Sequence, residues 1–395
     1  NIKLLTLSLK IPPFKFALSP DEPELTPKSG LWSNPLPASR HGSGQTQGDR
    51  LSDEAVTYGD YFTAVQHFLS QDDLSPVRRA AGELAGKTVS PADIDHIGVY
   101  LIKHGAFYHP AYAVATVGGG PLPFVINVAV SPAGRMIIDQ EYHNLSKLNC
   151  ELSDACWPRV FHKGRGEDLH GRPIPMFLGQ WFDGFYEFHL TGESPAGRSV
   201  KVWDPQRGHH TLSRGQVESC LQKAAFILTY AYNPLTFEAI GHWHHAAGDF
   251  VIALEADKVD LRLITVRRYA PMIENPQPDV ASMLEALLLF LVKISLKLRL
   301  DRLDGVGPMA CHCDDVVAAV SRGFFQGLGA ASPVRGLPED FDATVKEYAA
   351  LHSADQLTAI AMTVMEKAPF NSKERDLING FLGRHITALA RAIAT

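Results

Sequence analysis

Apolar and polar residues alternate in three successive stretches of the chain, and this pattern predicts three consecutive β-strands. The stretches cover residues 97–102, 111–117 and 124–130, and short turns separate them. Alternation with short turns is typical of antiparallel neighbours in a sheet. Over 135–148 the apolar spacing changes to three and four residues, which predicts a helix. We therefore expect residues 97–130 to form an antiparallel sheet on which this helix packs.

The rest of the chain is predicted to be mostly helical, with a few short strands. These strands are short apolar runs bounded by turn residues, at 158–161, 175–181, 250–254 and 259–266. Helical spacing covers 213–232 and everything after Pro278. The run 286–298 is apolar nearly all round, which indicates a helix buried in the core. The pattern as a whole predicts an α+β protein.

Two segments that precede the predicted sheet differ from it in composition. Residues 1–55 are rich in Pro, Ser and Gly, which is typical of an extended or poorly ordered arm. Residues 56–94 have helical spacing and contain a Ser-Pro pair of the kind that begins helices. We expect a preface of short helices here. A sheet-containing part over 95–185 and a mostly helical part over 186–395 should follow.

Composition narrows the class of partner. A net charge of −6 and a pI near 6.3 give no electrostatic reason to expect nucleic acid. Five cysteines without the spacing of a disulfide framework favour a reducing, cytoplasmic setting. The most apolar run contains Lys293 and Lys297 and is too short to span a bilayer. We expect a cytoplasmic protein with a small-molecule ligand and with neither a nucleic-acid nor a membrane partner; a protein partner stays undecided.

Candidate chemistry concentrates in one loop, within residues 240–252. His242, His244 and His245 fall within four residues of one another, and a Gly-Asp turn ending at Asp249 leads into an apolar strand. A polar cluster that passes through a tight turn into a buried strand indicates a loop that carries chemistry. The simpler interpretation is a surface cluster of histidines beside an ordinary turn.

This loop and the order of predicted elements resemble the two-lobed protein-kinase-like fold, in particular its aminoglycoside and choline phosphotransferase branch. The resemblance covers roughly residues 95–340. The family's catalytic loop reads His-Gly-Asp-Leu-His-x-Gly-Asn before an apolar strand, and here the same register runs from His242 to Asp249. His244 stands at the position of the catalytic Asp, and Asp249 replaces the metal-binding Asn. Thr265 stands where the family has its magnesium-binding Asp.

The predicted first lobe shows a similar mixture of matches and departures. Glu141 lies at the position of the family's helix glutamate, which pairs with a lysine on the third strand. That lysine position falls at Asn127. Trp181 and Phe182 begin a Trp-Phe-Asp-Gly segment that resembles the hinge through which the family reads adenine. The resemblance implies a small antiparallel-sheet lobe and a mostly helical lobe, with ATP and Mg²⁺ or Mn²⁺ as cofactors.

Most of the charges that phosphoryl transfer requires are missing. The reaction depends on positioning and on neutralising phosphate charge with lysine and metal ions. Of the family's Lys, catalytic Asp, metal-binding Asn and metal-binding Asp, only the third keeps a ligand-type side chain, as Asp249. His242 would hold the loop in shape by hydrogen bonds. We therefore expect a kinase-like protein that binds a nucleotide or another small ligand without ordinary Mg-ATP phosphotransfer.

Two other hypotheses stay open. In an atypical phosphotransferase that acts on a small hydroxylated substrate, His244 would be the base and Asp249 the sole metal ligand. In a metal-dependent enzyme, the histidine cluster and Asp249 would bind Zn²⁺, Fe²⁺ or Mn²⁺. The kinase register predicts one cleft formed by five residues: Asn127, Glu141, His244, Asp249 and Thr265. Simpler roles for single residues are a surface helix position for Glu141, a turn cap for Asp249, and core packing for Trp181 and Phe182.

Overall fold

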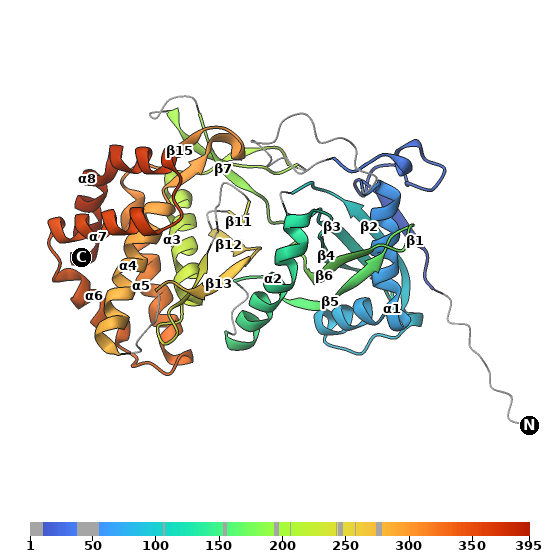
Figure 1. Cartoon of the computed structure of the whole chain (residues 1–395), viewed down its shortest axis with the longest axis horizontal. Coiled ribbons are helices and arrows are strands. Elements are labelled where there is room, and N and C mark those ends of the chain that lie inside the picture. The colour runs from blue at the N-terminus through green and yellow to red at the C-terminus, as the bar shows by residue number, and fades with distance from the viewer. Residues whose placement is uncertain are drawn as a thin grey trace, which may run out of the picture. The chain divides into compact units, whose positions relative to one another are not determined.

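A computed structural model describes most of the chain and shows a mixed α+β fold (Figure 1). The described residues are 11–37, 55–105, 107–152, 156–192, 197–205, 207–241, 243, 248–256, 258–273 and 279–395. They form two compact units. The first unit is built from Asn1–Ser146 and Pro158–Asp183, and the second from Lys147–Trp157 and Gly184–Thr395. The chain thus passes into the second unit within the Trp-Phe-Asp-Gly segment.

The first unit contains a six-stranded sheet with the strand order β1-β2-β3-β4-β6-β5. Its strands are β1 (Phe14–Ala17), β2 (Ile94–Leu101), β3 (Ala111–Val117), β4 (Gly120–Val128), β5 (Val160–Glu167) and β6 (Pro173–Gln180). The pairs β2–β3 and β3–β4 are antiparallel, which confirms the three consecutive strands expected over 97–130. β1 joins the edge parallel to β2, although its sequence lies in the segment for which only an extended arm was expected.

The long helix α1 (Tyr58–Ala85) covers one face of this sheet. Strand residues at alternate positions, such as Ile97 and Val99, pack with Phe62 and Phe68 of the helix in one apolar core. Glycines in β5 allow the close approach, because a Cβ on Gly166 would overlap the backbone carbonyl of α1. The helix is interrupted by non-helical residues directly before the Ser-Pro pair that predicted a new helix start.

The opposite face of the sheet carries α2 (Pro132–Glu151), whose residues up to Ser146 belong to this unit. Phe177 of β6 alternates with residues of the α1 core and so points to the other face. Its ring lies 5.8 Å from the ring of Tyr142 on α2. Asp139 of α2 also forms an ion pair with Lys163 of β5, at 2.9 Å. These contacts confirm that the helix bearing Glu141 packs on the sheet.

The second unit combines small sheets with six helices among its described residues. The sheets are formed by β7 (Phe188–Thr191), β8 (Ser199–Val202) and β9 (His210–Thr211); by β10 (Glu238–Gly241) and β13 (Arg268–Pro271); by β11 (Phe250–Glu255) and β12 (Lys258–Leu263); and by β14 (Leu300–Arg302) and β15 (Met309–Cys311). The helices are α3 (Arg214–Ala231), α4 (Val280–Lys297), α5 (Val316–Val334), α6 (Phe341–Ala350), α7 (Ala354–Lys367) and α8 (Ser372–Ala394).

The hairpin β14–β15 corrects the expectation that everything after Pro278 is helical. Asp304 and Gly305 have positive φ values of 52° and 74°, so the chain reverses tightly between these two short strands. The five helices otherwise match the expected number of segments. The three-stranded sheet β7–β8–β9 was not predicted either, because its strands are too short to display a clear alternation.

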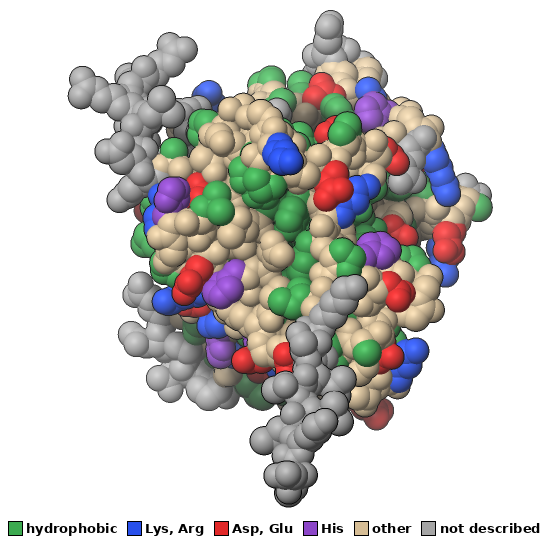
Figure 2. All heavy atoms as spheres, turned by 90° about the vertical axis from the view of Figure 1, so that its right-hand side faces the viewer, with side chains coloured by type: hydrophobic (Ala, Val, Ile, Leu, Met, Phe, Trp, Pro, Cys, Tyr) green, Lys and Arg blue, Asp and Glu red, His purple; other side chains and the backbone are tan. Residues whose placement is uncertain are grey.

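The helix α4 is the core helix that its apolar sequence predicts. Leu287, Leu291 and Ile294 are fully buried, and eleven of its residues are buried in all. Among the described helices, none is both long enough and apolar enough to cross a membrane. Figure 2 shows one face of the molecule, on which acidic and basic side chains alternate. The described side chains on this face form no single-sign patch of the kind that attracts a polyanion.

Candidate functional site

Three aromatic side chains form a surface on the face of the sheet opposite α1. Ile97 and Val99 of β2 and their neighbours on β3 point into the α1 core, so Tyr100 and Tyr112 point the other way. The rings of Tyr100 and Tyr112 are stacked at 5.9 Å, and the ring of Trp181 lies 4.8 Å from that of Tyr112. All three side chains are half-buried. We call Tyr100, Tyr112 and Trp181 the aromatic surface.

Asn127 lies on the same face of the sheet as the aromatic surface. Its neighbours Ile126 and Val128 belong to the α1 core, and Asn127 itself is paired with Phe177 of β6. The α2 helix packs on this face, so Asn127 and Glu141 are on the same side of the sheet. Asn127 is half-buried and carries no charge. The position that a lysine occupies in the resembling family is therefore neutral here.

Glu141 is buried inside the first unit, with an exposed fraction of 1%. The Tyr108 hydroxyl donates a hydrogen bond to Glu141 Oε2 at 2.7 Å. The simpler interpretation of Glu141 as a surface helix residue is therefore wrong. Tyr108 comes from the loop between β2 and β3, and sequence reasoning missed it because a tyrosine in a turn has no distinctive pattern.

The same loop contains a pair of histidines in direct contact. The Nδ1 atoms of His104 and His109 are 2.7 Å apart, and the Tyr61 hydroxyl donates a hydrogen bond to the backbone carbonyl of His109. Burial, reinforced by the neighbouring His104, lowers the pKa of His109 to about 4. His109 is therefore neutral at pH 7, and its role here is to fix the loop that holds Tyr108.

In the second unit, Asp249 is buried at the start of β11, with an exposed fraction of 1%. The Arg267 guanidinium donates to both carboxylate oxygens, at 2.7 Å to Oδ1 and 3.2 Å to Oδ2. Gly248, whose φ is 68°, makes the turn that brings the carboxylate into this position. Asp249 is therefore more than a turn cap, since it forms a two-pronged buried ion pair.

Thr265 lies close to Asp249 in the fold because β11 and β12 pair. Phe250 is opposite Leu263, and the Ile264 amide donates to the Asp249 carbonyl at 2.8 Å. The hairpin thus brings two predicted site residues to one end of the same ribbon. Sequence reasoning missed Arg267, although it follows Thr265 by two residues, because the family register directs attention to position 265 alone.

Trp181 and Phe182 are both half-buried in the first unit. Trp181 contacts Tyr112 in the aromatic surface, so core packing describes it only partly. His242, His244 and His245 lie outside the described residues. The single cleft expected from Asn127, Glu141, His244, Asp249 and Thr265 stays a prediction. Within each unit, the structure brings Asn127 and Glu141 to one face and Asp249 and Thr265 to one ribbon end.

Comparison with known proteins leaves the chain without an assigned relative. No protein-family model matches it, and no curated protein matches its sequence. Among the described residues, no group of three or more His, Cys, Asp or Glu side chains is placed to hold a metal ion. The relation to the phosphotransferase family therefore depends on the residue pattern and on the order of elements.

Proposed function

We propose that this protein is a kinase-like protein that binds a nucleotide or another small ligand and does not carry out ordinary Mg-ATP phosphotransfer. The order of elements supports the kinase-like assignment. Three antiparallel strands are followed by a helix with a buried glutamate, by two more strands, and by a unit rich in helices. The family resemblance in the loop that ends at Asp249 points the same way.

The observation that carries the absence of ordinary phosphotransfer is the ion pair between Asp249 and Arg267. Mg²⁺ is held by hard oxygen ligands, and Asp249 is the surviving candidate for that task. Both of its oxygens already accept hydrogen bonds from Arg267. A magnesium ion would have to displace a mostly buried guanidinium, which costs free energy because the displaced charge loses its partner. Asp249 thus serves as the partner of an arginine.

The first unit supports the same conclusion from the phosphate side. Glu141 accepts a hydrogen bond from a neutral tyrosine hydroxyl, and the lysine position of the family holds Asn127. An amide donates only a neutral hydrogen bond and cannot offset the charge that develops on a transferred phosphoryl group. A ligand can still bind, because binding requires less charge compensation than transfer does.

The aromatic surface supports the binding of a flat ligand such as a purine. A base stacks on exposed aromatic rings with a contribution of about 1–3 kcal/mol per base. Tyr100, Tyr112 and Trp181 are half-buried, so part of each ring is open to such a ligand. Trp181 also begins the segment that resembles the adenine-reading hinge. A nucleotide is therefore the first ligand to test.

The test is calorimetric titration with ATP and ADP, once with Mg²⁺ and once with EDTA. We expect binding that does not depend on Mg²⁺ and no formation of ADP from ATP. Trp181→Ala should weaken nucleotide binding roughly tenfold, because one stacking partner is lost. Tyr348→Ala, which removes a partly exposed ring from the second unit, should leave the affinity unchanged.

Two outcomes would contradict this proposal. Mg²⁺-dependent turnover that disappears in Asp249→Ala and His244→Ala would establish the atypical phosphotransferase instead. A failure of every nucleotide to bind would remove the nucleotide and move the search to other ligands. Bound zinc, iron or manganese in the purified protein, lost on replacing His242 or His245, would favour the metal-dependent enzyme.

A further inference from the structure

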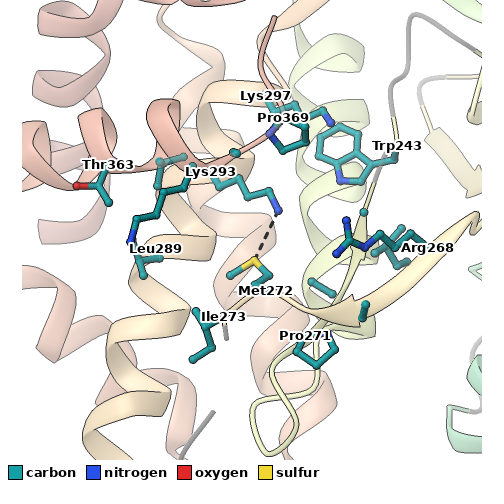
Figure 3. Close-up of a pocket in the computed structure, with 17 residues that line it drawn as sticks. Trp243, Arg268, Pro271, Met272, Ile273, Leu289, Lys293, Lys297, Thr363 and Pro369 are labelled. Carbon is teal, nitrogen blue, oxygen red and sulfur yellow. Dashed lines mark hydrogen bonds between the residues drawn. The ribbon is translucent and has the colours of Figure 1, made fainter. Parts of the chain in front are cut away.

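The second unit contains a pocket of about 220 Å³ between the β10–β13 ribbon, α4 and the end of α7 (Figure 3). One wall is apolar and is formed by residues such as Ile240, Met272, Ile273 and Leu289. Leu289 turns toward the pocket and is half-buried, whereas its neighbour Leu288 is fully in the core. The pocket is thus large enough for a small molecule, and its wall suits a carbon skeleton.

The charged side chains that line the pocket are all basic. They are Arg268, Lys293, Lys297 and Lys367. None of the described residues that line it carries a carboxylate. The chain as a whole has a net charge of −6, so this concentration of positive charge runs against the average. Converging cations without acidic neighbours favour an anionic ligand.

Two of these lysines are largely buried and form no ion pair with any described residue. The Lys297 ammonium lies 4.9 Å above the Trp243 ring, and the side chain is 9% exposed. The Lys293 ammonium contacts the Met272 sulfur at 3.6 Å, and a thioether is a weak acceptor. Burying an ammonium group without a carboxylate is costly, so these side chains are retained at the expense of stability.

The arrangement of the cations defines where an anion would bind. Figure 3 shows Lys293 extending from α4 and Arg268 from β13, with their charged ends turned toward one another across the pocket. Burial lowers the pKa of Lys293 to about 8, and nearby Lys297 and Arg268 lower it further. Burial also lowers the pKa of Lys297, although Glu374 and Asp249 partly oppose this. An anion among these groups would relieve their mutual repulsion.

We infer that this pocket binds a small organic phosphate, with the phosphate among Arg268, Lys293 and Lys297 and the carbon skeleton against the apolar wall. A phosphate monoester carries up to two negative charges, which suits several converging cations better than a carboxylate does. The inference uses residues of the second unit alone and does not depend on the proposed nucleotide binding.

The test uses phenyl phosphate, inorganic phosphate, benzoate and phenol as calorimetric probes at neutral pH and low salt. Phenyl phosphate should bind more tightly than inorganic phosphate, because it also fills the apolar part of the pocket. Phenol should give no measurable heat, and benzoate should bind more weakly than phenyl phosphate. Benzoate that binds as tightly as phenyl phosphate, or phenyl phosphate that does not bind at all, would overturn the assignment.

Variants locate the binding. Lys293→Met and Lys297→Met should each weaken phenyl phosphate binding by roughly tenfold or more, because each removes a buried charge that faces the anion. Lys293→Met should also raise the melting temperature of the unliganded protein, since no buried ammonium remains. The exposed Lys367→Met cannot disturb the core and should weaken binding less. Lys223→Met on α3 removes an equal charge outside the pocket and should change nothing.

Equal affinity in the wild-type protein, Lys293→Met and Lys367→Met would place phenyl phosphate elsewhere and contradict the inference. Trp181→Ala separates this inference from the proposed function. It should reduce nucleotide binding and leave the affinity for phenyl phosphate unchanged. Each of the two proposals can therefore fail without the other.

Discussion

At the scale of single residues, the buried charges of this protein have partners that sequence reasoning did not supply. The sequence indicated Asp249 as a site residue from its place after a glycine, and the structure gives it a buried position. Its partner Arg267 was not indicated, because an arginine after a strand has many possible roles. Glu141 similarly has Tyr108 as a partner from a separate loop. Partners of this kind depend on three-dimensional proximity, which a pattern along the chain does not contain.

The Asp249–Arg267 pair leads to a prediction on stability. Arg267→Met should reduce the free energy of unfolding by roughly 3–5 kcal/mol, because a buried carboxylate loses its guanidinium. The double variant Asp249→Asn/Arg267→Met should recover part of that loss, since the uncompensated charge is gone. Urea denaturation of the single and double variants measures both effects. A loss of less than about 1 kcal/mol in Arg267→Met would show that the pair is effectively solvated.

At the scale of elements, the long periodic segments were predictable and the short ones were not. The strands over 97–130, the helix with Glu141 and the buried helix α4 each extend over enough residues for their period to be visible. β1, β7–β9 and the β14–β15 hairpin have two to four residues per strand, so one or two side chains decide their pattern. Pairing with a neighbouring strand creates these elements, and a single sequence does not state which segments pair.

The packing of α3 against α5 depends on a glycine at their contact. A Cβ on Gly323 of α5 would overlap the Gln222 backbone carbonyl of α3. Gly323→Ala should therefore lower the free energy of unfolding by roughly 1–3 kcal/mol, because the helices must move apart. Gly380→Ala is the matched control, since a Cβ on this exposed glycine of α8 meets nothing. It should raise stability by up to about 1 kcal/mol through helix propensity. Equal effects in thermal unfolding of the two variants would contradict the tight contact.

At the scale of the whole molecule, buried histidines set the pH range of stability. His189 is buried between two carboxylates, with Nδ1 3.6 Å from Asp301 and Nε2 3.7 Å from Glu187. Burial alone would lower the pKa of His189, but the two carboxylates more than offset it and raise the pKa to about 9. His385 is different, because burial and the neighbouring Arg299 lower its pKa to about 3.

The sign of each shift fixes its effect on stability. His189 binds its proton more tightly in the folded state, so its contribution is complete below pH 6.5. On the order of 3 kcal/mol is lost as the pH rises through 9. His109 and His385 stay neutral when folded, so stability falls as the pH drops below 6.5 and the unfolded chain takes up protons. Stability should therefore be greatest at about pH 6–7.

Thermal unfolding from pH 4 to pH 10 measures this profile. His189→Gln should remove the loss on the alkaline side and leave the acid side as it is. The exposed His96→Gln is the matched control and should change neither side. A wild-type melting temperature that does not fall between pH 7 and pH 9.5 would show that His189 does not carry the proton assigned to it.

The parallel strand β1 has a consequence for the solubility of the chain. It pairs with β2 from Phe14 to Ala17 and so covers what would be an open edge of the central sheet. An uncovered edge presents unpaired amide and carbonyl groups to other molecules and invites edge-to-edge association. A shortened chain that begins at residue 56, where the helical spacing starts, would keep α1 and the sheet but lose this cover. Such a chain should self-associate through β2, and a strand-like peptide spanning residues 11–20, added in trans, should restore the monomer.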